Sequence, residues 1–224
     1  MTDLHYIQMY ILKELLLHPN SRFSNLNKTN LPNDHFNYHL KKLISYKYVN
    51  KINNIYKLTS SGKLYANTMD TDRLITEEQA KLSALIIAIK NDKLLIQKRL
   101  KEPYFGFYGF ISGKIRFGET IYEGAARELK EETGLSGNLE FKYILHEHII
   151  SKNQKLLEDK FFYVFKAVNL EGKLINIDAG KNQFISKEKF YKLKNAFYDV
   201  KDILTYLTNP KIHFIEKKYF IEEF

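Results

Sequence analysis

The chain contains no cysteine, only four prolines and ten glycines in 224 residues, and no low-complexity tract. Without cysteine, a thiolate metal site, a disulfide and a cysteine nucleophile are all excluded. Few prolines and glycines, together with 44% hydrophobic and 27% charged residues, are typical of a packed protein and not of a disordered one. We therefore expect every long segment to fold, in one or two cores.

Long apolar runs are missing as well. Charged and histidine side chains interrupt the first twenty residues, and no later run approaches the length that crosses a bilayer. We therefore expect neither a signal peptide nor a membrane span, and we predict a cytoplasmic protein. The lack of cysteine fits that compartment.

Basic residues outnumber acidic ones, and the formal net charge is +9. This charge favours polyanionic partners such as nucleotide phosphates, nucleic acid or anionic lipid. Charge alone does not choose among these partners.

The first third of the chain predicts a small, mainly helical domain over residues 1–71. Apolar spacing and turn residues predict helices, then a hairpin turning at Asn53-Asn54, then a helix capped by Thr59. The three helices are expected at 4–17, 23–26 and 35–48, and the hairpin strands at 48–52 and 55–58. This order resembles a winged helix-turn-helix domain.

The third helix of such a domain enters the major groove of double-stranded DNA. Its exposed face would present His35, Asn37, Tyr38, Lys41 and Lys42. Residues 1–70 hold nine Lys or Arg against four Asp or Glu, a net of +5, which favours phosphate contact. The alternatives are a protein-docking or dimerisation module, and lysines that only line a solvated face.

A polar linker is expected at 72–81, followed by a second domain over 82–208. Short apolar runs at 84–89, 93–96, 107–111, 139–145 and 161–165 predict strands. Helices are expected at 120–133 and within 187–207, which together with the strands indicate a layered α/β core. Residues 209–224 are left as a C-terminal extension that covers either its own domain or a partner subunit, so a homodimer is one option.

One stretch of the second domain predicts a sharply bounded acidic helix. Thr120 and Glu123 have the spacing of a capping box, and Gly134 stands where a left-handed terminator belongs. Glu128, Glu131 and Glu132 are spaced i, i+3 and i+4, so we expect their carboxylates to converge on one face. Such a cluster is compensated by Arg127 or by hard divalent cations, Mg²⁺ first and Mn²⁺ second. A solvated acidic helix face is the alternative.

This stretch resembles the Nudix box, G-x5-E-x7-R-E-U-x-E-E-x-G-U, where U is aliphatic. The matching residues are Gly113, Glu119, Arg127, Glu128, Leu129, Glu131, Glu132, Gly134 and Leu135. At ordinary residue frequencies, chance would produce this match less than about once in a million such chains. The Pro-Gly-Gly that usually precedes the box is replaced here by Ile111-Ser112-Gly113.

The resemblance implies an α/β/α sandwich with a mixed sheet. It also implies Mg²⁺-dependent hydrolysis of a phosphoric anhydride bond in a nucleoside diphosphate derivative. By the same resemblance, the metal ligands are Glu128, Glu131, Glu132 and the carbonyl of Gly113, and Arg127 orients them. Arg99 resembles a position that contacts the substrate.

The general base is left open by the resemblance. Glu128 is one candidate, and Asp178 is another because it stands six residues before Phe184 in a late segment. Glu158 and Asp159 are rivals to Asp178.

Two further functions stay open. The second domain could sense a nucleotide metabolite for a transcription regulator, or the chain could process RNA ends. A sensor does not need every catalytic carboxylate, so the complete glutamate set favours hydrolysis.

Overall fold

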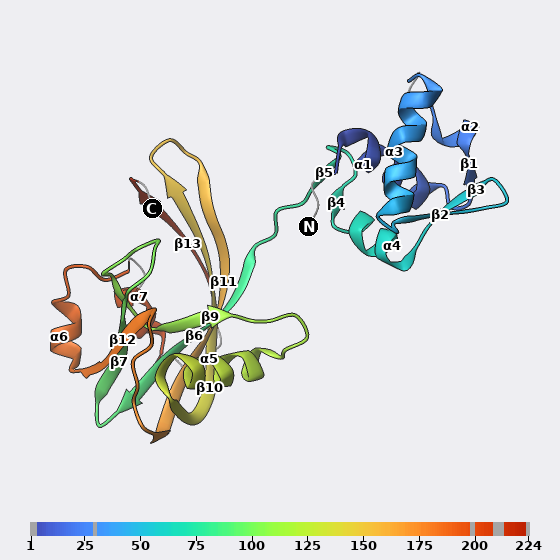
Figure 1. Cartoon of the computed structure of the whole chain (residues 1–224). Helices are drawn as coiled ribbons and strands as arrows, with labels where there is room; N and C mark the ends of the chain where they lie inside the picture. Colours follow the sequence, from blue (N-terminus) through green and yellow to red (C-terminus); the bar gives the residue numbers. More distant parts are fainter. Residues whose placement is uncertain (1–3, 29–30, 198–199, 208–212, 223–224) are drawn as a thin grey trace. The chain divides into compact units, whose positions relative to one another are not determined.

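The computed structural model describes residues 4–28, 31–197, 200–207 and 213–222. The chain forms two compact units, Met1–Glu78 and Gln79–Phe224 (Figure 1). The boundary between them falls inside the polar segment 72–81. Within that segment the short strand β5 (Ile75–Thr76) pairs with β4 (Met69–Asp70).

The first unit follows the order α1-β1-α2-α3-β2-β3-α4. These elements span α1 (Tyr6–Leu17), β1 (Ser21–Arg22), α2 (Phe23–Leu26), α3 (Asn33–Ser45), β2 (Val49–Ile52), β3 (Ile55–Leu58) and α4 (Ser60–Ala66). The three strands form an antiparallel sheet in the order β1-β3-β2. The sequence did not predict β1, because two residues carry no periodic signal.

Local sequence explains most of these boundaries. The hairpin turns at Asn53 and Asn54, whose φ angles of 47° and 61° lie in the left-handed region that asparagine tolerates. The side chain of Thr59 caps α4 by accepting the amide hydrogen of Gly62. The start predicted for α3 at residue 35 was two residues late, because the helix already begins after Pro32.

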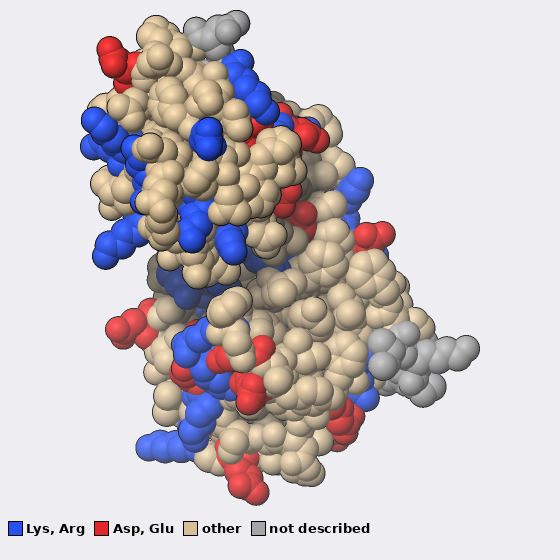
Figure 2. Space-filling view, turned by 90° about the vertical axis from the view of Figure 1, so that its right-hand side faces the viewer, with Lys and Arg blue, Asp and Glu red and all other residues tan. Residues whose placement is uncertain are grey.

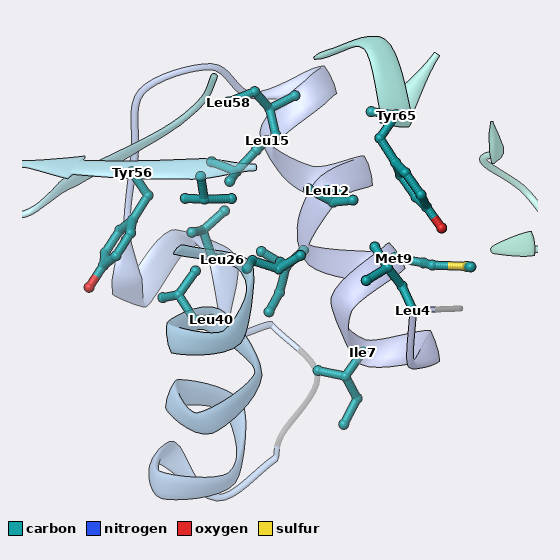
Figure 3. Packing of buried hydrophobic residues seen from close by; sticks show 14 of the residues in the cluster. Leu4, Ile7, Met9, Leu12, Leu15, Leu26, Leu40, Tyr56, Leu58 and Tyr65 are labelled. Carbon is teal, nitrogen blue, oxygen red and sulfur yellow. The ribbon is translucent and has the colours of Figure 1, made fainter. Parts of the chain in front are cut away.

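A single apolar cluster holds the first unit together (Figure 3). Helix α1 contributes its buried face at Ile7, Ile11 and Leu15, and α3 contributes Phe36 and Leu40. Side chains from β3 and α4, including Tyr56 and Tyr65, close the cluster. The unit therefore has its own core.

The second unit is built on one large mixed sheet. Its strands are β6 (Lys81–Lys90), β7 (Lys93–Arg99), β8 (Tyr108–Gly109), β9 (Ile111–Lys114), β10 (Leu135–Ser151), β11 (Leu156–Gly172), β12 (Gly180–Ile185) and β13 (His213–Ile221). The main order is β12-β7-β6-β11-β10-β13, with β8 paired to β7 and β9 to β6. The pairs β11–β6 and β10–β13 are parallel, and the other pairs are antiparallel.

Helices cover both faces of this sheet: α5 (Ile121–Thr133) one face, and α6 (Lys187–Tyr191) and α7 (Val200–Tyr206) the other (Figure 1). Strand β6 shows the division, because Ile86 packs in the cluster that contains Leu129 of α5, whereas its neighbour Leu85 packs with Phe190 of α6 and Ile203 of α7. The predicted α/β layering with a mixed sheet is confirmed.

Strand β13 lies in the segment that the sequence left as an extension. It runs parallel to β10 and forms one edge of the sheet, so this segment covers its own domain. Its side chains alternate between half-buried and exposed, and the exposed ones include Phe214 and Phe220. Apolar residues on the outer face hide the usual alternation, which explains why the strand was not predicted.

None of the helices in the described residues has the length and apolar character that a bilayer span requires.

Candidate active site

Helix α5 is fixed at both ends by its own sequence. Thr120 and Glu123 form a reciprocal capping box, in which the Thr120 side chain accepts the amide of Glu123 and the Glu123 carboxylate accepts the amide of Thr120. Gly134 ends the helix with a φ of 74°, a conformation that costs glycine little. Both predictions are confirmed, and the helix therefore presents its glutamates in a defined register.

Glu128 lies directly against the backbone of Gly113. A Cβ atom added at Gly113 would come within 2.0 Å of the Glu128 carboxyl carbon and oxygen, so only glycine permits this approach. Glu128 is 9% exposed, and Gly113 lies near the end of β9. The sheet thus places a backbone peptide and a buried carboxylate side by side.

Arg127 ties the acidic groups together. Its Nε and Nη2 donate to both oxygens of Glu119 at 2.5 and 2.9 Å, and its Nη1 donates to Glu128 at 2.6 Å and to Glu131 at 3.1 Å. Nη2 also donates to the carbonyl of Lys114. Hydrogen bonding to Arg127 is the main reason that the pKa of Glu119 falls to about 2.

Glu128, Glu131 and Glu132 share one helix but have different partners. Glu131 accepts a hydrogen bond from Arg116 at 3.1 Å, and Glu132 accepts one from Gln97 Nε2 at 2.9 Å. Among the described residues, Glu128, Glu131 and Glu132 do not form a group whose ligand atoms all lie within 4.8 Å of one another. The expected convergence therefore holds for the helix face, where Arg127 bridges Glu128 and Glu131, whereas Glu132 is held separately by Gln97.

These oxygen donors suit a hard divalent cation. Three carboxylates from one helix and an adjacent peptide carbonyl are the ligand types that Mg²⁺ prefers. The close approach of Glu128 to Gly113 leaves room for no side chain at this point of β9.

A cavity of about 190 Å³ opens beside Glu132. Polar groups line one part of it, among them Gln97, Ser112 and Glu132, and aromatic rings line another, among them Tyr104 and Phe197. Charged residues of both signs line it: Arg99, Lys101 and Lys160 are basic, and Glu132, Glu147 and Glu158 are acidic, with Lys160 paired to Glu158 at 2.7 Å. The cavity therefore combines charged, polar and aromatic groups next to the acidic helix, as a small-molecule site does.

Arg99 lies at the end of β7 and lines this cavity, but its guanidinium is already engaged. It donates to the carbonyls of Lys101, Glu102 and Pro103 at 3.0, 3.2 and 2.5 Å. Arg99 thus holds the loop after β7 in shape as well as facing the cavity.

Asp178 occupies an exposed turn just before β12. The strand brings this turn near the end of β7, because Gly180 is the register partner of Arg99. Among the described residues, no hydrogen bond or ion pair joins Asp178 to the glutamates of α5. Of its rivals, Glu158 lines the cavity, whereas Asp159 points to the other face of the sheet.

Two residues that contact Glu132 were not predicted from the sequence. Gln97 binds the Glu132 carboxylate, and Asn182 donates to the Glu132 carbonyl at 2.6 Å. They come from β7 and β12, which lie side by side only in the folded sheet. No local pattern in the sequence marks either residue.

A comparison with family models matches the NUDIX domain over residues 80–217. The chain belongs to the NUDIX family. A curated ADP-ribose pyrophosphatase from Methanocaldococcus jannaschii is 33% identical over 85 residues, which cover 36% of this chain and 50% of that protein. An oxidized purine nucleoside triphosphate hydrolase from Danio rerio is 26% identical over 117 residues, covering 49% of this chain and 69% of that protein.

Solved NUDIX structures share the fold. A MutT protein from Bacillus halodurans aligns with a TM-score of 0.54 at 25% identity, covering 62% of this chain and 90% of that one. A MutT NUDIX hydrolase from Burkholderia pseudomallei aligns with a TM-score of 0.51 at 20% identity, covering 58% of this chain and 100% of that one. The NUDIX family uses divalent metals, which agrees with the oxygen donors of α5.

Proposed function

We propose that the NUDIX unit is a Mg²⁺-dependent hydrolase that cleaves a phosphoric anhydride bond in a nucleoside diphosphate derivative. The observation that carries the proposal is the close approach of buried Glu128 to Gly113, on the helix whose Glu132 lines the cavity. The names of the two curated relatives support a nucleotide substrate, and ADP-ribose is the first compound to test.

In this proposal Glu128, Glu131, Glu132 and the Gly113 carbonyl bind the metal. Bound Mg²⁺ would neutralise charge on the phosphate oxygens and lower the pKa of an attacking water. Arg127 acts as a positioning residue, because it holds Glu128 and Glu131 from one side. Glu128 and Asp178 are the candidates for the general base.

The cavity would bind the rest of the substrate. Tyr104 and Phe197 offer ring faces, with their ring centroids 5.2 Å apart, and Lys101 supplies positive charge near the loop that Arg99 holds. A nucleotide combines a flat base with negatively charged phosphates, so the base would contact the aromatic rings and the phosphates would contact the lysine.

The test is a Mg²⁺-dependent hydrolysis screen over ADP-ribose, nucleotide sugars, dinucleoside polyphosphates and oxidised purine nucleoside triphosphates. Glu131→Gln and Glu132→Gln should each lose turnover, because each removes one charged ligand. Glu140→Gln is the matched control, since Glu140 is a partly exposed glutamate on β10 paired with Lys142. Wild-type protein that releases no phosphate, pyrophosphate or nucleoside monophosphate from any compound would refute the hydrolase.

For the first unit we propose a winged helix-turn-helix domain that binds double-stranded DNA through α3. Its support is the order of elements around the β1-β3-β2 sheet and a basic surface, part of which is visible in Figure 2. On α3, the residues His35, Tyr38, Lys41 and Lys42 are exposed and Asn37 is half-buried. A groove of about 520 Å³ beside α3 is lined by Asn37, Arg22 and Lys51.

DNA binding is tested by fluorescence anisotropy on duplex DNA over a salt series. Replacing Lys41 with Gln should weaken binding and reduce the magnitude of the salt slope by about 1 if the lysine contacts a phosphate. Lys63→Gln on α4 is the control for a lysine outside α3. Equal binding by Lys41→Gln and wild type at every salt concentration would contradict the assignment.

The DNA-binding assay and the hydrolysis screen together separate a hydrolase from a sensor. DNA binding that a nucleotide releases, by a protein with no turnover, would favour the transcription regulator. Preference for RNA together with release of terminal phosphate would favour RNA end processing.

A further inference from the structure

Two histidines and an aspartate, all of residue types that can bind metals, lie together on the β10–β11 hairpin, away from α5. His146 and His148 on β10 point to the same face as Asp159 on β11, because His148 and Asp159 are direct register partners. One ligand atom from each residue lies within 4.8 Å of the other two. The hairpin extends past the part of this face that α5 covers (Figure 1).

The distances within the cluster are close to those between the ligands of one bound ion. His146 Nε2 lies 2.8 Å from Asp159 Oδ1, and His148 Nε2 lies 3.5 Å from Asp159 Oδ2. Ligands of a tetrahedral zinc ion are themselves about 3.3 Å apart, given bonds of about 2.0 Å. Small side-chain rotations are therefore enough to place one ion between the three residues.

A second carboxylate orients His146. Its Nδ1 lies 3.1 Å from Glu216 Oε1 on β13, and a carboxylate accepts the Nδ1 hydrogen. This leaves Nε2 directed at Asp159, as a metal-binding histidine requires. The ring of Phe161 stacks on His146 with centroids 3.9 Å apart and an angle of 8°, which limits its rotation.

The cluster is also open to solvent on one side. The side chains of His146, His148 and Asp159 are 13%, 29% and 34% exposed, so an ion can enter and a water can complete the coordination. Two imidazoles and one carboxylate select a transition metal over Mg²⁺, which prefers oxygen ligands alone.

We propose that His146, His148 and Asp159 form a zinc-type transition-metal site, with Glu216 as the group that positions His146. The site is distinct in position and in ligand chemistry from the glutamates of α5. A bound ion would link β10 to β11 directly and to β13 through Glu216, at the free end of the hairpin. As a metal ligand, Asp159 would have a role other than that of general base.

The experiment measures binding of Zn²⁺ alone to metal-free full-length protein by calorimetry, and of Co²⁺ alone by its visible absorption. We expect one equivalent of Zn²⁺ and a Co²⁺ spectrum typical of four-coordinate geometry. Both should persist in the Glu131→Gln, Glu132→Gln double variant, which weakens the acidic patch of α5. Wild-type protein that binds no Zn²⁺, or a binding that the double variant abolishes, would overturn the site.

Variants of the cluster localise the binding. His148→Ala and Asp159→Asn should each lose the Co²⁺ spectrum, and Glu216→Gln should weaken Zn²⁺ binding by about 10- to 100-fold. His18→Ala is the matched control, because His18 is an exposed histidine of the first unit. Circular dichroism of each variant shows whether it folds, and undiminished binding by folded His148→Ala and Asp159→Asn would overturn the assignment.

Discussion

At the scale of single residues, the most demanding contact of the candidate site is the one between Gly113 and Glu128. The glycine matters here for space and not for an unusual φ angle, because a Cβ atom would overlap the Glu128 carboxylate. The sequence motif identified both residues, but only the fold shows that one lies against the other.

Replacing Gly113 with Ala should therefore lower kcat/KM strongly and change the temperature of thermal unfolding only slightly. The added methyl group must displace the Glu128 carboxylate, and a shift of about 1 Å in a catalytic group can cost about a hundredfold in rate. Gly124→Ala is the comparison on α5, because its Cβ would lie 3.3 Å from the end of the Glu119 side chain, which need move only slightly. Steady-state kinetics and thermal unfolding check the prediction, which is contradicted if Gly113→Ala keeps wild-type kcat/KM.

A buried histidine makes the first unit sensitive to acid. His39 on α3 is 6% exposed and stacks on His5 with ring centroids 4.5 Å apart. Burial is the main cause that lowers the pKa of His39 below its ordinary value of 6.5, and the neighbouring His5 and His35 lower it further. The unfolded chain therefore takes up the proton before the folded chain does.

We expect the first unit to lose stability as the pH falls below about 6.5, toward the lowered pKa of His39. Above that pH both states are neutral at His39, and the loss ends below the folded pKa. Hydrogen exchange of peptides from α1 and α3, corrected for the intrinsic rate at each pH, measures the effect. His39→Gln, which cannot titrate, should show a smaller loss; an equal loss would rule out His39 as the cause.

At the scale of elements, α5 is the segment that the sequence specifies most completely. Its cap residues, apolar stripe and terminator all lie in the fifteen residues from Thr120 to Gly134, so local interactions decide its ends. Strands β10 and β11 are the contrast, since each is 17 residues long although their apolar runs predicted only short strands. The two strands pair with each other along nearly their whole length, which carries both through polar residues.

The cap of α5 provides a test at this scale. Thr120→Ala should destabilise the NUDIX unit by about 1 kcal/mol, because the amide of Glu123 loses its partner. Thr120→Ser keeps a hydroxyl at the same place and should leave the free energy of unfolding nearly unchanged. Urea unfolding followed by circular dichroism compares the two variants, and an equal loss in both would show that the hydroxyl is not the stabilising group.

At the scale of the whole molecule, the chain consists of two units with separate apolar cores. The residues of the first core all come from positions 4–74, and those of the other two clusters come from positions 84–215. A unit that buries its own core can fold by itself.

We therefore expect residues 79–224 alone to fold and to keep the kcat/KM of the full chain in the hydrolysis assay. The groups proposed for catalysis, from Arg99 to Asp178, all lie in this unit. The full-length protein serves as the control in the same assay, and circular dichroism reports folding. A folded fragment without turnover would show that the first unit takes part in catalysis.

The sequence by itself determined the NUDIX family motif, the caps and the acidic face of α5, and the helices of the first unit. These features depend on residues close together in the chain, where spacing and caps are direct signals. The tertiary structure alone decided that Gly113 lies against Glu128, that Gln97 and Asn182 contact Glu132, and that His146, His148, Asp159 and Glu216 meet on one face. Those contacts join separate strands, and strand pairing depends on the registry of the entire sheet rather than on any local pattern.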